Sequence, residues 1–556
     1  MNSNEIRSKF LAYFGSIDHK ILPSASLIPH DDTLLFTAAG MVPLKDYFSG
    51  NKEPANPNMA SSQKCIRTID IDIIGDTDRH LSFFEMLGNF SVGKYFKKEA
   101  INYSYDYITK HLNIPKEKLW FTVYKDDDES YDIWKNDIGV PEDRIQRGNE
   151  DNFWHMNIPG PCGPCSEIFI DRGEKYGQDG GPIGGGEDRY IEIWNLVFME
   201  SIQNKPFEVV GELPSKNIDT GMGLERLAMV LQEKDSPFEI DTFSNMYEAL
   251  SKIVTKSNKK LERIILDHIK ASTFMISDGV VPTNEGRGYI LRRLLRRAVR
   301  AINIVSENLI SLNFLVDIVI ENYKESYPDL VKNQDKIKKL ITSEELLFHK
   351  TLLKGTTEIT TKLNSGNEFS TKDAFQLFET FGFPIELTEE IVAEHGYSID
   401  KDEFNKLFEE HRKKSNKNTL STATIKIDTD KNNFVGYDLL SHESEIYDVQ
   451  NIDGQKVIFT KDTPFYYEAG GQVSDEGYLI SSGIEMSIKK LIQTNSGAVG
   501  FIVKNSNIRI GDIVTQVVNS NFRNAVSKSH TAAHIVHASL RNILGTHVAQ
   551  AGSHVA

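Results

Sequence analysis

Residues 79–90 read Arg-His-Leu-Ser-Phe-Phe-Glu-Met-Leu-Gly-Asn-Phe, and residues 63–67, before them, read Gln-Lys-Cys-Ile-Arg. The apolar run that begins at Phe83 predicts a buried or half-buried strand. A polar loop separates the two basic clusters. This arrangement suits a triphosphate, because guanidinium groups pair with phosphate oxygens in a bidentate manner. The alternative is a solvated hairpin with ordinary surface arginines, and the spacing does not decide between them.

Composition predicts a multidomain globular protein. The 556 residues are 39% hydrophobic and 26% charged, which argues against a mainly disordered chain. At roughly 150 residues per domain, the length corresponds to three or four domains. The sequence contains no run of about 18 uncharged apolar residues, so we expect no membrane partner.

The net charge and the cysteine content limit the possible binding partners of the protein and its possible cellular compartment. The net charge of −16 argues against a general electrostatic grip on nucleic acid. We expect no DNA partner, although a local basic patch is allowed because binding follows the local field. Three cysteines are too few, and odd in number, for a disulfide framework. The N-terminus lacks the apolar core of a signal peptide, so we expect a cytoplasmic protein.

The pattern of apolar and polar residues changes along the chain. Short strand-like runs give way to helical spacing of apolar residues, then to a polar stretch, and then to strands separated by turns such as Asp453-Gly454. The last strands suggest a small barrel or sandwich, and a helix begins near Arg523. The predicted parts are a first domain at 1–245, a helical domain at 246–411, a linker at 412–428, a β-barrel at 429–515 and the start of another domain at 516–556.

The segment at residues 160–168 reads Gly-Pro-Cys-Gly-Pro-Cys-Ser-Glu-Ile and follows Trp154 closely. A CxxC pair can be half of a zinc site or a redox pair. Because the chain has no second cysteine pair, a four-cysteine zinc site is excluded. Gly and Pro around the cysteines are more typical of a tight wall close to a ligand, which is the interpretation we favour.

Two further segments carry single polar residues that chemistry could use. Residues 192–199 form an apolar strand around Asn195, and a buried amide must bond to backbone or to a ligand. Residues 217–227 place Asp219 before a glycine turn that opens a helix bearing Arg226. The carboxylate could cap that helix, or it could hold a substrate ammonium while the arginine holds phosphate. Position alone leaves both open.

Five arginines share one helix face after the segment Asn-Glu-Gly-Arg-Gly-Tyr at residues 284–289. Cations on one stripe repel each other unless something anionic lies against them. We favour contact with RNA, and the alternative is an internal network with the protein's own carboxylates. The stripe comprises Arg292, Arg293, Arg296, Arg297 and Arg300.

Five segments together resemble the motifs of class II aminoacyl-tRNA synthetases, and specifically those of the alanyl-tRNA synthetase family. They are Phe-Thr-Ala-Ala-Gly-Met at 36–41, Phe-Phe-Glu-Met-Leu-Gly-Asn-Phe at 83–90, the Gly-Pro-Cys segment at 160–168, Trp-Asn-Leu-Val-Phe-Met at 194–199 and Asp-Thr-Gly-Met-Gly-Leu-Glu-Arg at 219–226. Any one of them could arise by chance, but five in order could not.

The resemblance implies an α+β multidomain fold. It consists of an antiparallel class II sheet with flanking helices for aminoacylation, a helical tRNA-recognition domain, a small β-barrel and the start of an editing domain. The implied activity is that of a ligase, which activates alanine with ATP to alanyl-adenylate and transfers it to the 3′ end of tRNA(Ala), with Mg²⁺ on the phosphates. Two alternatives are a catalytically silent tRNA-binding paralogue and a free-standing zinc deacylase.

The resemblance also implies roles for single residues. Arg67 and Arg226 are the expected catalytic residues, at the α- and γ-phosphates. The expected ATP-binding residues are Arg67, Arg79, His80, Glu85 and Arg226, the expected alanine-binding residues are Trp154, Asn195, Asp219 and Gly221, and the expected tRNA-binding residues are Arg287, Arg292, Arg293, Arg296 and Arg297. One departure concerns motif 2, where the family usually has an acid two residues after the arginine, whereas Arg67 is followed by Thr-Ile-Asp.

The C-terminal part is rich in histidine, with five of fifteen His in the last 27 residues. His530 and His534 project from one helix face at a spacing that suits two metal ligands, although surface histidines explain the pattern equally well. The resemblance implies that both hold Zn²⁺ in an editing domain, together with a later Cys and His. Since no Cys follows Cys165, we expect a fragment with an incomplete zinc site and weak or missing deacylation.

Overall fold

The computed structural model divides the chain into two units, Met1–Leu407 and Phe408–Ala556. It describes residues 1–31, 33–156, 159–306, 310–364, 369–381, 383–393, 395–415, 431–452, 455–494, 496–503, 508–544, 548, 550 and 552–556. Among them, no helix is both long enough and apolar enough to cross a bilayer. The predicted turn Asp453-Gly454 and most of the predicted linker at 412–428 lie outside these ranges, and the domain boundaries stay predictions.

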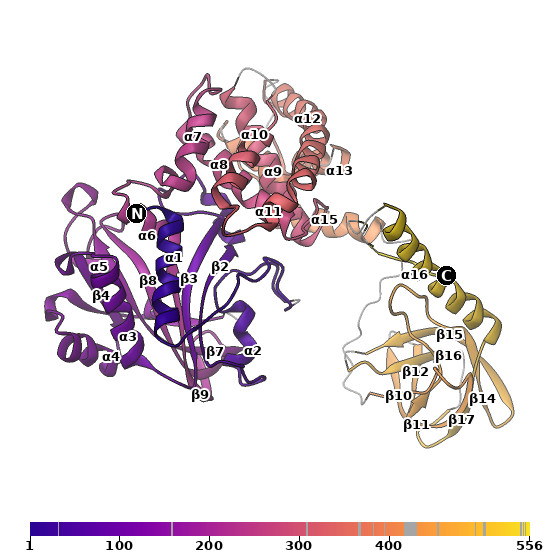
Figure 1. The fold of residues 1–556 in the computed structure, drawn as a ribbon. Helices are drawn as coiled ribbons and strands as arrows, with labels where there is room; N and C mark the ends of the chain where they lie inside the picture. The colour runs from indigo at the N-terminus through magenta and orange to yellow at the C-terminus, as the bar shows by residue number, and fades with distance from the viewer. Residues whose placement is uncertain are drawn as a thin grey trace. The chain divides into compact units, whose positions relative to one another are not determined.

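A nine-stranded sheet organises the described part of the first unit, in the order β1-β2-β3-β9-β8-β7-β4-β5, with β6 paired to β7 (Figure 1). Its strands are β1 (Lys20–Ile21), β2 (Asn58–Ile66), β3 (Phe83–Val92), β4 (Leu119–Tyr124), β5 (Ile145–Gly148), β6 (Phe153–His155), β7 (Gly160–Asp171), β8 (Tyr190–Lys205) and β9 (Glu208–Gly223). The central pairs are antiparallel, as expected. The sheet as a whole is mixed, because β1 pairs with β2 and β4 with β5 in parallel.

Helices flank the sheet and cover its apolar side chains. They are α1 (Ser3–Ser16), α2 (Lys45–Phe48), α3 (Lys97–Asp106), α4 (Asp128–Asp132), α5 (Gly181–Gly184) and α6 (Leu224–Leu231). Helix α1 starts at a capping box made by Asn2 and Glu5, which satisfies otherwise unpaired N–H groups. Phe10 and Phe14 of this helix pack on Trp194 of β8, with ring centroids 5.9 and 6.4 Å apart. This face of the sheet is therefore core, whereas the opposite face is core only in part, where Phe48 of α2 packs with Phe90 and Val197.

The predicted change to helix near residue 246 is confirmed. The helices are α7 (Asp241–Ser251), α8 (Lys259–Ser277), α9 (Gly286–Val305), α10 (Asn313–Tyr323), α11 (Asp329–Lys332), α12 (Gln334–Asn364), α13 (Thr371–Phe381), α14 (Ile385–Ala393) and α15 (Lys401–Ser415). Figure 1 shows α7 to α13 gathered beyond one end of the sheet. Helix α8 packs on β3, where Phe274 stacks on Phe83 at 4.1 Å between ring centroids. The helices thus adjoin the strand that carries the central motif.

The second unit contains the predicted barrel. Its closed barrel has the order β11-β12-β16-β15-β14-β17, with a core that includes Phe465 and Phe501. The elements of this unit are β10 (Asn433–Phe434), β11 (Ser441–Ile452), β12 (Gln455–Thr460), β13 (Asp462–Thr463), β14 (Gly477–Ser481), β15 (Ile484–Gln493), β16 (Val499–Val503), β17 (Ile513–Val518) and α16 (Ser520–Leu544). The helix predicted from Arg523 corresponds to α16.

Candidate functional site

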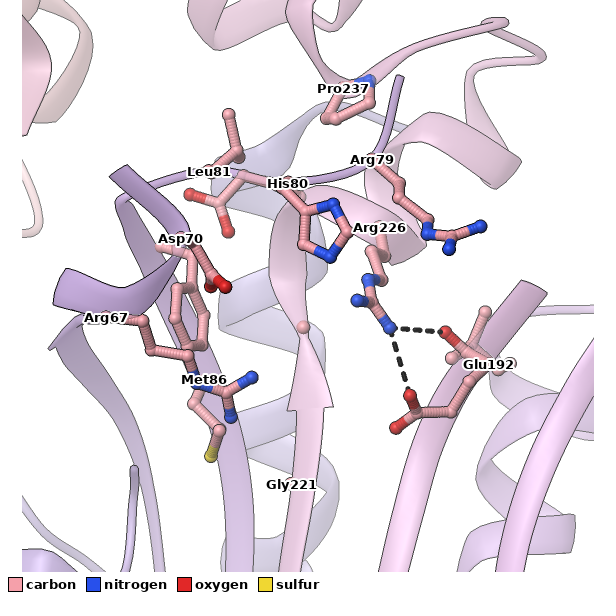
Figure 2. Close-up of a pocket in the computed structure, with 14 residues that line it drawn as sticks. Arg67, Asp70, Arg79, His80, Leu81, Met86, Glu192, Gly221, Arg226 and Pro237 are labelled. Carbon is pink, nitrogen blue, oxygen red and sulfur yellow. Dashed lines mark hydrogen bonds and ion pairs between the residues drawn. The ribbon is translucent and has the colours of Figure 1, made fainter. Parts of the chain in front are cut away.

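A pocket with about 750 Å³ of space between atoms, part of it open to solvent, lies on the face of the sheet opposite α1 (Figure 2). The loop between β2 and β3, the strands β3, β8 and β9, and the start of α6 supply its walls. The lining residues are Arg67, Asp70, Arg79, His80, Leu81, Phe84, Met86, Glu192, Ile193, Gly221, Gly223, Glu225, Arg226 and Pro237. The structure therefore brings together Arg67, Arg79, His80, Gly221 and Arg226 of the predicted site.

Three arginines face this pocket, Arg67 and Arg79 from the two ends of the β2–β3 loop and Arg226 from α6. The guanidinium of Arg67 lies over the Phe84 ring, 4.9 Å from its centroid, and such stacking orients the group. Arg226, in the first turn of α6, bonds to the Glu192 carboxylate at 3.0 Å, as Figure 2 shows. Arg79 bonds to Glu187 at 2.5 Å. Three guanidinium groups around one pocket form an anion site, since each can pair with phosphate oxygens.

His80 lies between these arginines in Figure 2. Its Nδ1 is 2.8 Å from the Thr77 hydroxyl. Burial lowers the pKa of His80, with Asp70 opposing the shift and the charges of Arg226, Arg79 and Arg67 adding to it. The lowered pKa favours the neutral imidazole, which can bond to a ligand without adding a fourth cation to the pocket.

Asp219 lies inside β9, where its Cα pairs with Phe90 on one side and Val197 on the other. The residue before α6 that occupies the cap position is Gly223, so the interpretation of Asp219 as a helix cap is wrong. The side chain is buried, and burial raises its pKa to about 7. Among the described residues, none donates a hydrogen bond or pairs as a cation with this carboxylate. A buried acid in this condition is suited to a cationic ligand.

The other predicted alanine-binding residues lie on the same part of the sheet. Asn195 of β8 pairs in register with Gly221 of β9. A Cβ atom at Gly221 would lie 2.9 Å from the Met86 sulfur, so a larger residue would displace Met86. Trp154 of β6 packs against the apolar cluster that contains Cys165 and Val197. Of the predicted alanine-binding residues, Gly221 alone is among the described residues that line the pocket.

Glu85 does not line the pocket, which corrects its predicted role in binding ATP. Along β3, Phe84 and Met86 line the pocket, whereas successive side chains of a strand point to opposite faces. Glu85 therefore points to the other face. There it pairs with Arg7 of α1 at 2.6 Å and accepts a hydrogen bond from the Tyr327 hydroxyl at 2.6 Å.

The arginine stripe of α9 is turned inward, which corrects the prediction that Arg296 and Arg297 bind tRNA. Both are buried. Arg296 bonds to Glu344 of α12 at 2.8 Å, and Arg297 bonds to the Ile71 carbonyl and, at 3.1 Å, to His268. For these two arginines, the structure therefore agrees with the alternative interpretation, a network of bonds within the protein.

The remaining predicted tRNA-binding arginines are half-buried and have partners within the chain. Arg293 pairs with Asp72 of the β2–β3 loop, and Arg292 with Glu344 at 3.2 Å. Arg287 donates to the carbonyls of Leu34 and Leu35 at 3.0 and 2.5 Å. A tRNA contact would have to replace these bonds, so these three arginines stay only a prediction.

The two cysteines of the CxxC segment lie in β7, with both side chains buried. Burial raises the pKa of the Cys162 thiol to about 11, which makes it a poor metal ligand or nucleophile. A Cβ atom at Gly163 would lie 1.9 Å from the Phe198 carbonyl oxygen. The glycine therefore permits the close approach of β7 and β8, in agreement with a tight wall.

His530 and His534 stack on one face of α16, with ring centroids 5.1 Å apart. The Nδ1 atom of His530 is 2.9 Å from the Gln472 amide oxygen. In the part of the chain that the structure describes, no group of three or more metal-ligating side chains occurs. The two histidines are thus adjacent, as predicted, but bring no third ligand with them.

Sequence reasoning missed several acidic residues of the site. Glu192 lines the pocket and pairs with Arg226, and Asp70 lines it as well. Glu167 of β7 accepts a hydrogen bond from the Asn195 amide at 3.0 Å. A charged residue within an apolar strand was a visible signal for Glu192 and Glu167, but only strand pairing shows which partners they meet.

Comparison with known proteins places these features in a family. The profile described as tRNA synthetases class II (A) matches residues 5–522. Three curated proteins named alanine–tRNA ligase align with all of this chain. The one from Thermobifida fusca is 41% identical, with 67% of it covered; that from Caldicellulosiruptor saccharolyticus is 42% identical, with 66% covered; and that from Saccharophagus degradans is 43% identical, with 67% covered. The chain spans about two thirds of the length of these relatives.

Proposed function

The chain belongs to the class II tRNA synthetase family, and from this premise we propose that it is an ATP-dependent ligase that joins alanine to tRNA(Ala). In the first step, an alanine carboxylate oxygen attacks the α-phosphorus of ATP, and pyrophosphate leaves. In the second, the terminal ribose hydroxyl of the tRNA attacks the carbonyl carbon of alanyl-adenylate, and AMP leaves. Two observations support the proposal. The three aligned relatives are named alanine–tRNA ligase, and the arginine-lined pocket suits the ATP of the first step.

The observation that carries the proposal is the unpaired carboxylate of Asp219. It lies two residues from Gly221 on one strand, so the two residues belong to the same face of the sheet, and Gly221 lines the pocket. An ammonium group next to Asp219 would compensate the buried charge, and an α-amino acid supplies one. A module that only bound RNA would have no use for such an acid.

The arginines serve the phosphate end in this proposal. Arg67 would contact the α-phosphate and Arg226 the γ-phosphate, with Arg79 and His80 on the loop above. The rate gain comes from alignment and from stabilising charge on the transferring group, because adenylate formation needs little proton transfer. Mg²⁺, which ATP carries, would neutralise further phosphate charge, and Asp70 and Glu192 are the pocket carboxylates that are not fully buried.

We propose that tRNA(Ala) and alanine are the substrates and that the protein works in a reducing, cytoplasmic setting, which is supported by three unpaired thiols. For Zn²⁺, we propose only that His530 and His534 act as two of its ligands. Two imidazoles do not complete a tetrahedral zinc site, so we expect weak zinc binding and weak or missing deacylation. Hydrolysis of tRNA(Ala) mischarged with serine, at a rate above background, would contradict this.

The test is ATP–pyrophosphate exchange with alanine, glycine and serine separately. We expect alanine-dependent exchange, and a loss of at least about a hundredfold in kcat/KM for alanine with Asp219→Ala, because an ion pair between buried groups is removed. The control is Asp143→Asn, an exposed site. Exchange with no amino acid, in folded protein that still binds tRNA, would favour the silent paralogue.

A further inference from the structure

Glu167, Asn195 and Gly221 lie side by side across three strands. Asn195 of β8 pairs in register with Glu167 of β7 and with Gly221 of β9. Directly opposed residues share a face of the sheet, and Gly221 lines the pocket. Glu167 therefore lies behind Asn195 as seen from the pocket.

The Asn195 amide is bonded at one end only. Its Nδ2 donates to the Glu167 Oε1 atom at 3.0 Å. Its Oδ1 is buried and, among the described residues, has no hydrogen-bond partner. A buried amide oxygen without a hydrogen bond is destabilising, and only a donor can satisfy it.

Glu167 is itself held in place from the far side. The Thr122 hydroxyl and the Asn152 amide each donate to its Oε2 atom at 3.1 Å. Asn152 also donates to Thr122 at 2.8 Å, so that hydroxyl is already used as an acceptor. The three groups that hydrogen-bond to Glu167 are all donors, which is the pattern around a carboxylate. Because an ionised carboxylate cannot donate, the Asn195 Nδ2 faces it in that form and Oδ1 faces away.

The Glu167 carboxyl is mainly protonated at pH 7 and ionises at a higher pH. Burial, and then the charge of Glu192, raise its pKa to about 8, and the bonds from Thr122 and Asn152 oppose the shift. Kinetic tests of its role therefore belong at a pH about one unit above that value, where the carboxylate form predominates.

We infer that Glu167 is a positioning residue for amino-acid binding, which turns the Asn195 amide so that Oδ1 accepts a hydrogen bond from the α-ammonium group that Asp219 holds. This inference rests on the proposed function, because of alanine's groups only the ammonium can donate. Met86 lines the pocket, with its sulfur next to Gly221, and this flexible side chain is what the amino acid would displace.

The test combines variants with ATP–pyrophosphate exchange, and reads the KM values for alanine and ATP separately. Glu167→Met removes the acceptor at similar volume, and we expect the KM for alanine to rise about tenfold, since one hydrogen bond to a charged group is lost, while the KM for ATP stays within about twofold. Glu167→Gln keeps one accepting oxygen and should restore most of the alanine affinity. In Asn195→Ala protein, adding Glu167→Met should cause no further loss.

The matched control is Glu345→Met in α12. Glu345 is also a buried acid with two donors, the Ser311 hydroxyl at 2.9 Å and the Leu312 N–H at 2.6 Å, and its replacement should leave the KM for alanine unchanged. An unchanged KM for alanine in Glu167→Met, an equal rise in both KM values, or a full additional loss in the double variant would overturn the inference while leaving the ligase proposal intact. Wild-type protein without alanine-dependent exchange would overturn both.

A measurement independent of these variants is a crystal structure of the wild-type protein with a non-hydrolysable alanyl-adenylate analogue. The Asn195 Oδ1 atom should lie within about 3.2 Å of the ammonium nitrogen, with Nδ2 still on Glu167. An ammonium beyond reach of Oδ1, or an amide turned so that Nδ2 faces the analogue, would overturn the inference.

Discussion

Asp219 shows at the scale of one residue how a functional group costs stability. The carboxyl is buried, and its pKa is raised from 3.8 to about 7. The unfolded chain therefore ionises this group at a lower pH than the folded chain. The free energy of unfolding therefore falls as the pH rises from about 4 to about 7. Above pH 7 the full destabilisation by the buried charge is present.

Replacing this acid should stabilise the protein where the acid is charged. We expect Asp219→Asn to raise the free energy of unfolding at pH 8 by about 1–3 kcal/mol, below the limit of about 4 kcal/mol that the pKa difference sets, since a buried amide also lacks a partner. At pH 4 the gain should vanish. Urea unfolding of both proteins at the two pH values measures this. A gain of equal size at pH 4 would show that charge is not its cause.

Single contacts between elements hold the sheet to the helices around it. Arg7 of α1 forms two hydrogen bonds to Glu85 of β3, at 2.8 and 2.6 Å, and the Glu85 side chain is fully buried. The Tyr327 hydroxyl, which lies just before α11, bonds to the same carboxylate at 2.6 Å. One acid thus ties three elements together on the side of β3 that faces away from the pocket.

Breaking this tie should destabilise the first unit strongly. Arg7→Met leaves Glu85 buried without a cation, and we expect a loss of about 3–5 kcal/mol in the free energy of unfolding. Lys9→Met, at an exposed position of the same helix, is the control and should change it by less than about 0.5 kcal/mol. Denaturant titration followed by far-UV circular dichroism measures both. A loss below 1 kcal/mol for Arg7→Met would mean that Glu85 finds other compensation.

Helix α9 offers a second prediction at this scale, concerning the arginine stripe. Arg297 is buried and anchors the β2–β3 loop through the Ile71 carbonyl. Arg297→Met should therefore lower the thermal stability of the protein while leaving the salt dependence of tRNA binding unchanged. Were Arg297 a phosphate contact, the slope of log K against log salt concentration would drop by about one. Filter binding at several salt concentrations distinguishes the two.

At the scale of the whole molecule, the pocket belongs to one unit. All of its lining residues lie between Arg67 and Pro237, within the unit that ends at Leu407. Among the residues that the structure describes, the second unit therefore contributes none to the lining of the pocket.

A shortened protein tests this independence. A fragment of residues 1–415 should fold and should catalyse alanine-dependent ATP–pyrophosphate exchange with kcat and KM values within about twofold of the full chain, because each unit has its own core. The full chain is the control, measured side by side. Folded fragment without exchange would mean that the second unit completes the site.

The sequence by itself determined the elements and the kind of site. Local periodicity predicted the strands at Phe83 and at residues 192–199, the helices after residue 246 and the barrel, because spacing along the chain decides which face of an element is apolar. The motifs around Arg67, Asp219 and Arg226 predicted a family, and with it a substrate class.

Only the tertiary structure decided which charges face the pocket and which face each other. Glu85 and the arginines of α9 have the residue types of a binding site, yet Arg7, Glu344 and the Ile71 carbonyl occupy them. From the sequence, Asp219 could be a helix cap or a ligand-binding acid. The continuation of β9 through Asp219 excludes the helix cap. The reason is physical: the free energy of a charge depends on the partners and the water around it, and residues distant in sequence supply both.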